Sequence, residues 1–130
     1  MGAKLLYIED NHQNFYLVDF ILKSRGHTVL WARNGQEGIA TALQEHPDLI
    51  LLDIQLPIMD GYAVATCLRE QHHLSEVPIV ALTSYAMAGD RAKALAAGCS
   101  EYIEKPINPT TFADHIDALL AQNPHRSTEE

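Results

Sequence analysis

Acidic side chains follow two of the apolar segments of this chain. Glu9 and Asp10 come directly after "LLYI", and Asp53 comes directly after "LILL". Two like charges 4 Å apart repel each other by about 1 kcal/mol in water and by about 4 kcal/mol at an effective dielectric constant near 20. A site that gathers these acids therefore needs a counter-charge, and an all-oxygen ligand set favours a hard cation such as Mg²⁺.

Hydroxyl groups and a lysine follow two later apolar segments. Thr83 and Ser84 come after "PIVAL", and Lys105 comes after "EYIE". A carboxylate nucleophile, metal ligands, a cation and hydroxyls together suit phosphoryl transfer, in which positioning and charge neutralisation supply most of the catalysis. An aspartate can accept a phosphoryl group as an acyl phosphate.

The elements that must position these residues alternate along the chain. Strand-like runs at 4–8, 28–32, 48–52, 78–82 and 101–104 are separated by segments with helical spacing. This alternation predicts an α/β fold, a doubly wound (βα)5 three-layer sandwich with a parallel, flavodoxin-like sheet. For the strand order 2-1-3-4-5, the crevice at the carboxyl ends lies between the first and third strands, so the three acids should meet there.

Capping residues and glycines predict where several helices begin and end. Gly26 is expected to stop the first helix, and Asn34 with Glu37 resembles a capping box at the second. Asp60 is expected to cap the third helix. The fourth helix is predicted over 87–98, an alanine-rich segment that buries little area per residue and is a plausible mobile element.

Length and charge limit the classes of protein to consider. The chain has 130 residues, a net charge of −8 and 47% hydrophobic residues, which indicate one domain over residues 1–123 with a polar tail over 124–130. The acidic balance disfavours direct binding to nucleic acid. No apolar stretch is long enough to insert into a membrane, and the cytoplasm is the expected location. Cys67 and Cys99 form no C-x-x-C pair, and Cys99 is expected in an exposed loop.

Four motifs carry a resemblance to a known family. They are "IED" (8–10), "LLDIQLPIMDG" (51–61), "ALTSYAMAGD" (81–90) and "YIEKPI" (102–107). With them the chain resembles, from Lys4 to Gln122, the receiver domain of bacterial two-component response regulators, in its stand-alone single-domain form.

The resemblance implies a phospho-acceptor and a metal site. Asp53 would accept a phosphoryl group from a histidine kinase or a histidine phosphotransfer protein. Asp10, Asp53 and the backbone carbonyl of Gln55 would bind Mg²⁺ or Mn²⁺. Many relatives have two aspartates where this chain has Glu9 and Asp10, and the longer Glu9 is expected to reach the metal through water.

The resemblance also implies residues that stabilise the phosphoryl group and report it. Lys105 would pair with the phosphoryl group, and Thr83 would move to hydrogen-bond it. Ser84 stands where alanine is common and would alter these contacts. Tyr102 would turn inward when Thr83 moves, and the Lys105–Pro106 peptide bond would be cis.

Further expectations concern access and output. Gln55 and Tyr85 would line the mouth of the site and tune phosphoryl lifetime. The fourth helix, fifth strand and fifth helix would form the output surface, which binds a downstream effector protein because the tail is too short to form an output domain. The protein would be a signalling protein that catalyses only its own phosphorylation and dephosphorylation.

Three other functions are weighed against this one. A haloacid-dehalogenase-like phosphatase needs a second acid two residues after its nucleophile, and Gln55 occupies that position. A flavodoxin-like cofactor module would want a phosphate-binding loop where "EDNHQN" (9–14) places acids. A receiver fold that only docks partners and is never phosphorylated remains an open alternative.

Overall fold

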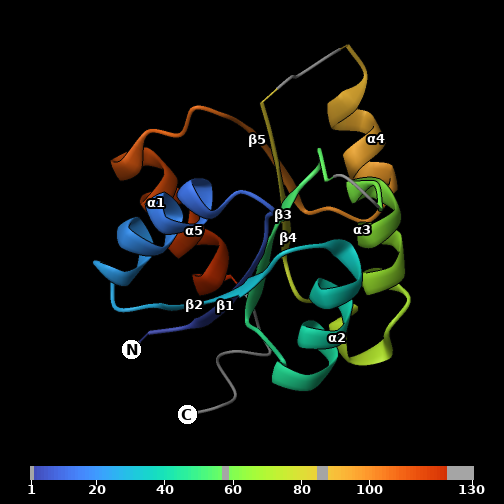
Figure 1. Ribbon diagram of the computed structural model, residues 1–130, viewed down its shortest axis with the longest axis horizontal. Helices are drawn as coiled ribbons and strands as arrows, with labels where there is room; N and C mark the ends of the chain where they lie inside the picture. The colour runs from blue at the N-terminus through green and yellow to red at the C-terminus, as the bar shows by residue number, and fades with distance from the viewer. Residues whose placement is uncertain (1, 57–58, 85–87, 123–130) are drawn as a thin grey trace.

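Five parallel strands form a single sheet between two layers of helices in the computed structural model, which describes residues 2–56, 59–84 and 88–122 (Figure 1). The strand order is β2-β1-β3-β4-β5, and the predicted fold class and strand order are therefore confirmed. The elements are β1 (Lys4–Ile8), α1 (His12–Lys23), β2 (Thr28–Ala32), α2 (Gly35–Glu45), β3 (Leu49–Asp53), α3 (Gly61–Arg69), the short 3-10 helix η1 (His72–Leu74), β4 (Ile79–Thr83), α4 (Asp90–Ala96), β5 (Glu101–Glu104) and α5 (Pro109–Ala121).

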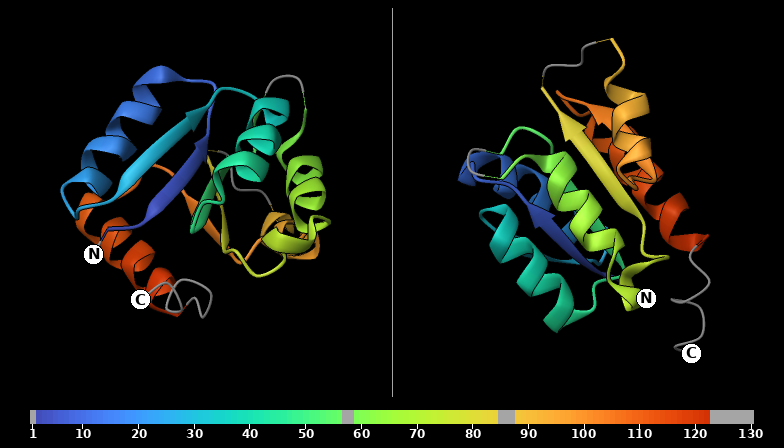
Figure 2. Two further views of the ribbon diagram at one scale, coloured as in Figure 1. Left: turned by 90° about the horizontal axis from the view of Figure 1, so that it is seen from below. Right: turned by 90° about the vertical axis from the view of Figure 1, so that its right-hand side faces the viewer.

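The two layers of helices cover opposite faces of the sheet. Helices α1 and α5 lie on one face, and α2, α3 and α4 lie on the other (Figures 1 and 2). Alternate residues of a strand point to opposite faces. Accordingly, Leu6 and Ile8 of β1 pack in the core under α2 and α3, whereas Leu5 and Tyr7 pack in the core under α1 and α5. Both central strands, β3 and β4, are buried along their whole length.

Asp53 and Thr83 are the last residues of β3 and β4, one residue beyond the apolar runs 48–52 and 78–82. Asp53 pairs in register with Leu82, and the N–H of Lys105 donates to the carbonyl of Thr83 at 2.7 Å. The acid and the hydroxyl are therefore fixed by the sheet rather than carried on loops.

Side-chain caps begin the helices where the sequence predicts them. The side chain of Asn34 accepts a hydrogen bond from the N–H of Glu37 at 2.9 Å. The reciprocal hydrogen bond of a capping box is shifted by one residue, because the Glu37 carboxylate accepts from the backbone N–H of Arg33 rather than from that of Asn34. Asp60 caps α3 by accepting from the N–H of Tyr62 at 2.7 Å.

Local expectations at Gly26, at Cys99 and at the two segments around Tyr85 and the tail have different outcomes. Gly26 ends α1 as predicted: it takes a left-handed φ of 87°, its N–H donates to the carbonyl of Lys23 at 2.9 Å, and the N–H of His27 donates to the carbonyl of Leu22 at 3.2 Å. Cys99 is buried rather than exposed, and burial raises the pKa of its thiol to about 11. Tyr85 and the tail 124–130 lie outside the described residues.

Arg69 ties the carboxyl end of α3 to two neighbouring turns. Its Nη1 donates to the carbonyls of Leu74, Ser75 and Val77 at 2.8, 3.1 and 2.8 Å. Its Nε and Nη2 donate to the carbonyl of Gly98, just after α4, at 3.0 and 2.7 Å. Burial of the guanidinium lowers the pKa of Arg69. One arginine thus holds α3, η1 and the α4–β5 turn together.

A second polar cluster lies at the amino-terminal edge of the sheet, joining α5 to the turn before β2. His27 is buried, its Nδ1 accepts from the N–H of Ala3 at 3.0 Å, and its Nε2 lies 2.6 Å from Asp117. Arg25 donates to Asp117 at 2.8 Å and to Asp114 at 2.9 Å. We call these five residues the His27 cluster.

The helices of the described residues do not include one with the length and hydrophobicity that a membrane span requires.

Candidate functional site

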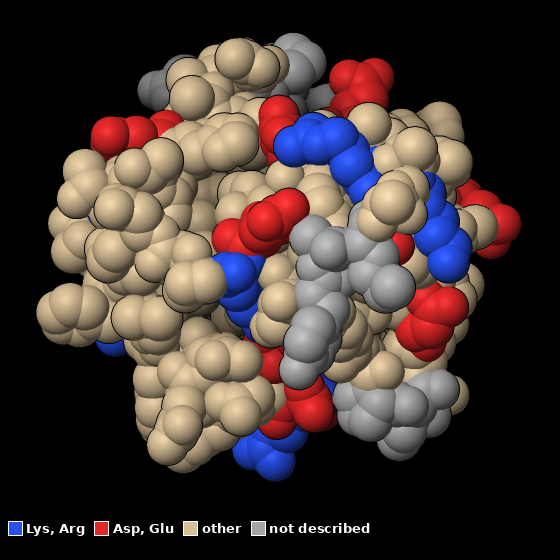
Figure 3. Space-filling view, turned by 90° about the horizontal axis from the view of Figure 1, so that it is seen from above, with Lys and Arg blue, Asp and Glu red and all other residues tan. Residues whose placement is uncertain are grey.

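The carboxyl ends of four strands bring the sequence-predicted residues to one edge of the sheet. Glu9 and Asp10 follow β1, Asp53 ends β3, Thr83 ends β4, and Lys105 follows β5. Parallel pairing aligns these ends, because Ile8 pairs with Leu52. Figure 3 looks onto this edge and shows acidic side chains lying beside a basic side chain near its centre.

Three carboxylates from distant parts of the chain meet here. Glu9, Asp10 and Asp53 each offer one oxygen, and these oxygens all lie within 4.8 Å of one another. Glu9 and Asp53 are buried, with 1% and 5% of their surface exposed, whereas Asp10 is exposed. The all-oxygen set, with one acid open to solvent, fits a Mg²⁺ ion that keeps several of its waters.

Glu9 is held on both carboxylate oxygens. Its Oε1 accepts from the Tyr7 hydroxyl at 2.8 Å and from Lys105 Nζ at 3.1 Å, and its Oε2 accepts from the N–H of Asn11 at 3.1 Å. Burial by itself raises the pKa of Glu9, but the three donors outweigh it and lower the pKa. Glu9 is therefore a charged group that the protein itself neutralises in part.

Tyr7 is a site residue that the sequence analysis missed. Its side chain is fully buried, and burial followed by the charge of Glu9 raises the pKa of its hydroxyl, which therefore stays protonated and donates to Glu9. A signal was available, because residues two apart on a strand share a face. Tyr7 stands two residues before Glu9.

Asp53 has one oxygen fixed and one beside the lysine. Its Oδ1 accepts from the N–H of Gln55 at 2.8 Å, and its Oδ2 lies 3.4 Å from Lys105 Nζ. Burial, and then the negative charge of Glu9, raise the pKa of Asp53 to about 6. The acid is therefore harder to ionise than an ordinary aspartate, and a cation placed beside it would favour the charged form.

The Gln55 side chain bridges the loop after β3 to the end of β4. Its Nε2 donates to Thr83 Oγ1 at 2.8 Å, and its Oε1 accepts from the N–H of Ser84 at 3.1 Å. We call this pair of hydrogen bonds the Gln55 clamp. Sequence reasoning assigned Gln55 a backbone carbonyl and a place at the mouth, but it did not foresee that the side chain would bind Thr83 and Ser84.

The remaining predicted residues lie around β5. Tyr102 is buried, pointing inward, and its carbonyl accepts from Arg91 of α4 at 3.3 Å. The Arg91 guanidinium also lies 5.7 Å from the Tyr102 ring centroid. The Lys105–Pro106 peptide bond is cis.

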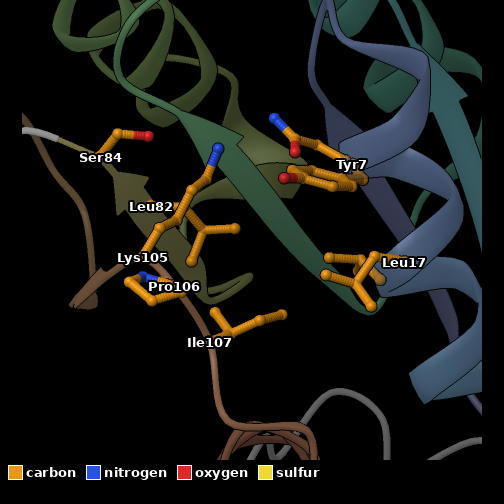
Figure 4. A pocket seen from close by; sticks show the side chains of 9 residues that line it. Tyr7, Leu17, Leu82, Ser84, Lys105, Pro106 and Ile107 are labelled. Atoms are coloured by element: carbon orange, nitrogen blue, oxygen red, sulfur yellow. The ribbon is translucent and has the colours of Figure 1, made fainter.

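A pocket of about 390 Å³ opens beside the lysine, between α1 and the loop that follows β5. Leu17 and Val18 of α1 line one side, and Pro106 and Ile107 line the other. In Figure 4 the Lys105 side chain and the Tyr7 hydroxyl reach toward the same space from opposite sides of this pocket.

Apolar side chains on α1 continue this surface into solvent. Tyr16, Leu17 and Phe20 are 57%, 49% and 76% exposed. Residues three and four apart on a helix are neighbours, so the three side chains form one patch, which we call the α1 patch. Exposed large apolar side chains gathered in this way often mark a protein-binding surface.

Trp31 supports the site from the neighbouring strand. Its indole Nε1 donates to the carbonyl of Glu9 at 2.8 Å, and its ring stacks on Phe15 with centroids 4.8 Å apart. Trp31 therefore packs against α1 and also donates a hydrogen bond to the main chain of the acidic pair.

Comparisons with known proteins agree with this geometry. The family model described as response regulator receiver domain matches residues 5–117. The polar-differentiation response regulator DivK of Brucella ovis is 36% identical over 120 residues, which are 92% of this chain and 98% of that protein. DivK of Brucella anthropi shows the same identity and coverage.

Solved structures show the same fold. The receiver domain of a sensor histidine kinase from Pseudomonas aeruginosa, with a magnesium ion coordinated in its active-site cleft, is similar with a TM-score of 0.86 and 32% identity, covering 94% of this chain and 100% of that one. A CheY-like receiver domain protein from Methanospirillum hungatei has a TM-score of 0.88 and 26% identity over 97% of this chain and 99% of that one.

Proposed function

Since the chain belongs to the response regulator receiver domain family, we propose that it accepts a phosphoryl group on Asp53 and thereby switches its binding of a partner protein. One observation carries the proposal. Lys105 Nζ lies 3.1 Å from Glu9 Oε1 and 3.4 Å from Asp53 Oδ2, so a cation already stands beside the acid that would take the phosphoryl group.

The donor is a phosphohistidine on a histidine kinase or a phosphotransfer protein. An Asp53 oxygen attacks phosphorus, the phosphorus–nitrogen bond breaks, and its electron pair returns to the imidazole of the donor. The product is an acyl phosphate, which water later cleaves to inorganic phosphate and free Asp53. Lys105 stabilises the phosphoryl oxygens as their charge grows in the transition state.

Mg²⁺ fits the acidic cluster. Asp10, Asp53 and the carbonyl of Gln55 are the proposed direct ligands, and Glu9 contributes through water because its own oxygens are already hydrogen-bonded. When bound, the cation offsets the repulsion among the acids and neutralises phosphoryl charge. A magnesium ion in the cleft of the Pseudomonas aeruginosa receiver domain supports this assignment.

Thr83, Ser84 and Tyr102 pass the change to the surface. A phosphoryl group adds about −1.5 to −2 charge and three acceptor oxygens. The Thr83 hydroxyl and the Ser84 N–H can donate to these oxygens once they leave the Gln55 clamp. Movement at the end of β4 then repacks Tyr102 and Arg91, which join β5 to α4. The output surface is formed by α4, β5 and α5.

The pocket and the α1 patch provide the place for the phosphodonor protein. The pocket is lined by Ser84 and Lys105, so a histidine inserted there would arrive beside the lysine whose Nζ lies 3.4 Å from Asp53 Oδ2. The α1 patch would cover the flanks of that contact with apolar surface. A donor protein with a complementary apolar surface is therefore the expected partner.

The test is the intact mass of the protein after incubation with acetyl phosphate. Wild type should gain one phosphoryl group in a Mg²⁺-dependent manner, and Asp53→Asn should gain none. If folded wild type takes no phosphoryl group from acetyl phosphate or from a phosphohistidine protein, the proposed function is wrong, and docking without phosphorylation becomes the better description.

A further inference from the structure

Tyr7 lies inside the fold but reaches the site through its hydroxyl. Its ring packs near Phe15 with centroids 6.3 Å apart, and its hydroxyl donates to Glu9 Oε1 at 2.8 Å. We propose that Tyr7 is a positioning residue for phosphoryl transfer: it holds Glu9 as the anchor of Lys105 and keeps that carboxylate from becoming a direct Mg²⁺ ligand. This inference rests on the proposed function and assigns it a further residue.

The hydrogen bonds of the Glu9 carboxylate carry the first half of the argument. An ionised carboxylate has about four acceptor positions. Tyr7 and Lys105 share Oε1, and the N–H of Asn11 occupies a position on Oε2. Glu9 is 1% exposed, whereas Asp10 is open to solvent. The protein therefore directs Glu9 inward and leaves Asp10 to face the cation.

The position of the lysine carries the second half. A lysine ammonium sits on a flexible four-carbon stem and needs an anchor if it is to stay in one place. Glu9 Oε1 is the nearer of its two acidic partners, at 3.1 Å against 3.4 Å for Asp53. Glu9 offers an oxygen within 4.8 Å of oxygens of Asp10 and Asp53, so a bound cation could draw this carboxylate away from Lys105, and the hydrogen bond from the Tyr7 hydroxyl opposes that movement.

Removal of the hydroxyl should change two quantities in opposite directions. Tyr7→Phe keeps the buried ring and removes one donor to the carboxylate, so more of the negative charge of Glu9 is available to a cation. Mg²⁺ should bind about three- to tenfold more tightly, the range expected for part of a charge-assisted hydrogen bond. Transfer from acetyl phosphate should slow by a similar factor of about three to ten, because Lys105 is held less firmly.

The experiment uses the full chain and a control that loses a hydroxyl group far from the site. Wild type, Tyr7→Phe and the control Thr66→Val, which removes an exposed hydroxyl on α3, are titrated with Mg²⁺ by calorimetry without any phosphodonor. Their rates with acetyl phosphate are then measured by intact mass. A site that was merely loosened would bind Mg²⁺ more weakly, so tighter binding with slower transfer identifies positioning.

A second variant keeps the test decisive if Tyr7→Phe does not fold. Glu9→Asp shortens the side chain by one methylene and so moves the carboxylate away from the Tyr7 hydroxyl. This variant should also bind Mg²⁺ more tightly than wild type. The double variant Glu9→Asp, Tyr7→Phe should then have about the same Mg²⁺ affinity as Glu9→Asp alone. Unchanged or weaker Mg²⁺ binding in Tyr7→Phe, or in Glu9→Asp where only that variant folds, would overturn the proposal. Because the titrations need no phosphodonor, they decide the role of Tyr7 even if wild type accepts no phosphoryl group.

Discussion

At the scale of single residues, the site holds its reactive groups in bonds that a phosphoryl group would have to replace. The Thr83 hydroxyl and the Ser84 N–H are both engaged by Gln55, although both are suited to bind phosphoryl oxygens. Lys105 is likewise shared between Glu9 and Asp53. The groups proposed to act as the switch are therefore hydrogen-bonded to neighbouring side chains in this structure.

Gln55→Ala should release the Gln55 clamp and speed phosphorylation. The variant keeps the backbone N–H bond to Asp53 and removes two hydrogen bonds that compete with the phosphoryl oxygens. If about 1 kcal/mol of that competition is relieved, the initial rate with acetyl phosphate should rise about fivefold. Gln71→Ala, at the end of α3, is the control. An unchanged or slower rate in Gln55→Ala would show that the clamp does not oppose the reaction.

The raised pKa of Asp53 predicts a cost in stability at neutral pH. The folded state binds the proton up to about pH 6, whereas an unfolded aspartate releases it near pH 3.9. Between these values the folded state holds more protons than the unfolded state, so the contribution of Asp53 to stability falls as the pH rises. Above the folded pKa the cost is complete.

Asp53→Asn should therefore be more stable than wild type at about pH 7.5, by roughly 1–3 kcal/mol, with the difference much smaller near pH 4. Urea unfolding without divalent cations measures both values. Equal differences at the two pH values would mean that the effect comes from packing rather than from charge. Added Mg²⁺ should stabilise wild type more than the variant.

The residues of the site could be predicted because the ends of parallel strands meet, but their partners could not. Glu9, Asp53, Thr83 and Lys105 follow or end strands that the apolar pattern identifies. The Tyr7 and Gln55 hydrogen bonds depend on side-chain conformations, which packing selects once the fold has formed. A pattern of residue types contains no information on which of several rotamers brings an amide to Thr83.

At the scale of elements, α4 is short and its two ends are held differently. Its carboxyl end is fixed through Gly98 to Arg69 by hydrogen bonds of 3.0 and 2.7 Å, whereas Arg91 in its first turn lies over the Tyr102 ring and donates one hydrogen bond of 3.3 Å to the Tyr102 carbonyl. One long hydrogen bond with a cation–ring contact is a weaker attachment than two short bonds to one carbonyl. The amino end of α4 is therefore the end that can shift in response to the site.

The boundaries of the elements show the same limit of sequence reasoning. Strand and helix types were predicted throughout, because apolar spacing and caps are local. The apolar runs 48–52 and 78–82 stop one residue before the ends of β3 and β4, because Asp53 and Thr83 are polar, while the ladder bond from Ile54 N–H to the carbonyl of Leu82 extends the sheet past Asp53. Tertiary hydrogen bonds overrode the local composition.

Arg69→Met should destabilise the protein, and Arg69→Lys should be similarly destabilised although it keeps the positive charge. The guanidinium satisfies four carbonyl groups in a fixed planar arrangement that an ammonium cannot reproduce. Loss of these bonds should lower the free energy of unfolding by about 2–4 kcal/mol. Urea unfolding tests this, with Arg33→Met, whose guanidinium lies over Trp31, as the control. A loss below that of the control would show that the carbonyls find other partners.

At the scale of the whole molecule, the carboxyl and amino ends of the strands form two edges of the sheet that differ in their polar side chains. The carboxyl edge holds the acids, the lysine and the Gln55 clamp, and any phosphoryl charge enters there. The amino edge is closed by the His27 cluster, which ties α5 to the turn before β2. A response at the first edge can therefore spread through β4, α4 and β5 while the second edge stays in place.

Hydrogen exchange should show this division. With the phosphoryl mimic beryllofluoride and Mg²⁺, backbone amides in β4, α4 and β5 should change their protection, while those around His27 should change little. Asp53→Asn treated in the same way is the control. A uniform change across the chain would instead indicate global stabilisation by the bound ligand.

If the α1 patch binds the phosphodonor as proposed, recognition and chemistry are carried by separable parts of the chain. The side chains of Leu17 and Phe20 project from α1 into solvent, while the hydrogen bonds described around Asp53 come from strand ends and the loops beside them. Changes at a few positions of one helix could redirect the protein to a different donor and leave the acceptor reaction intact. After a gene duplication, substitutions on this one surface could therefore give each copy its own phosphodonor and so separate the two signals.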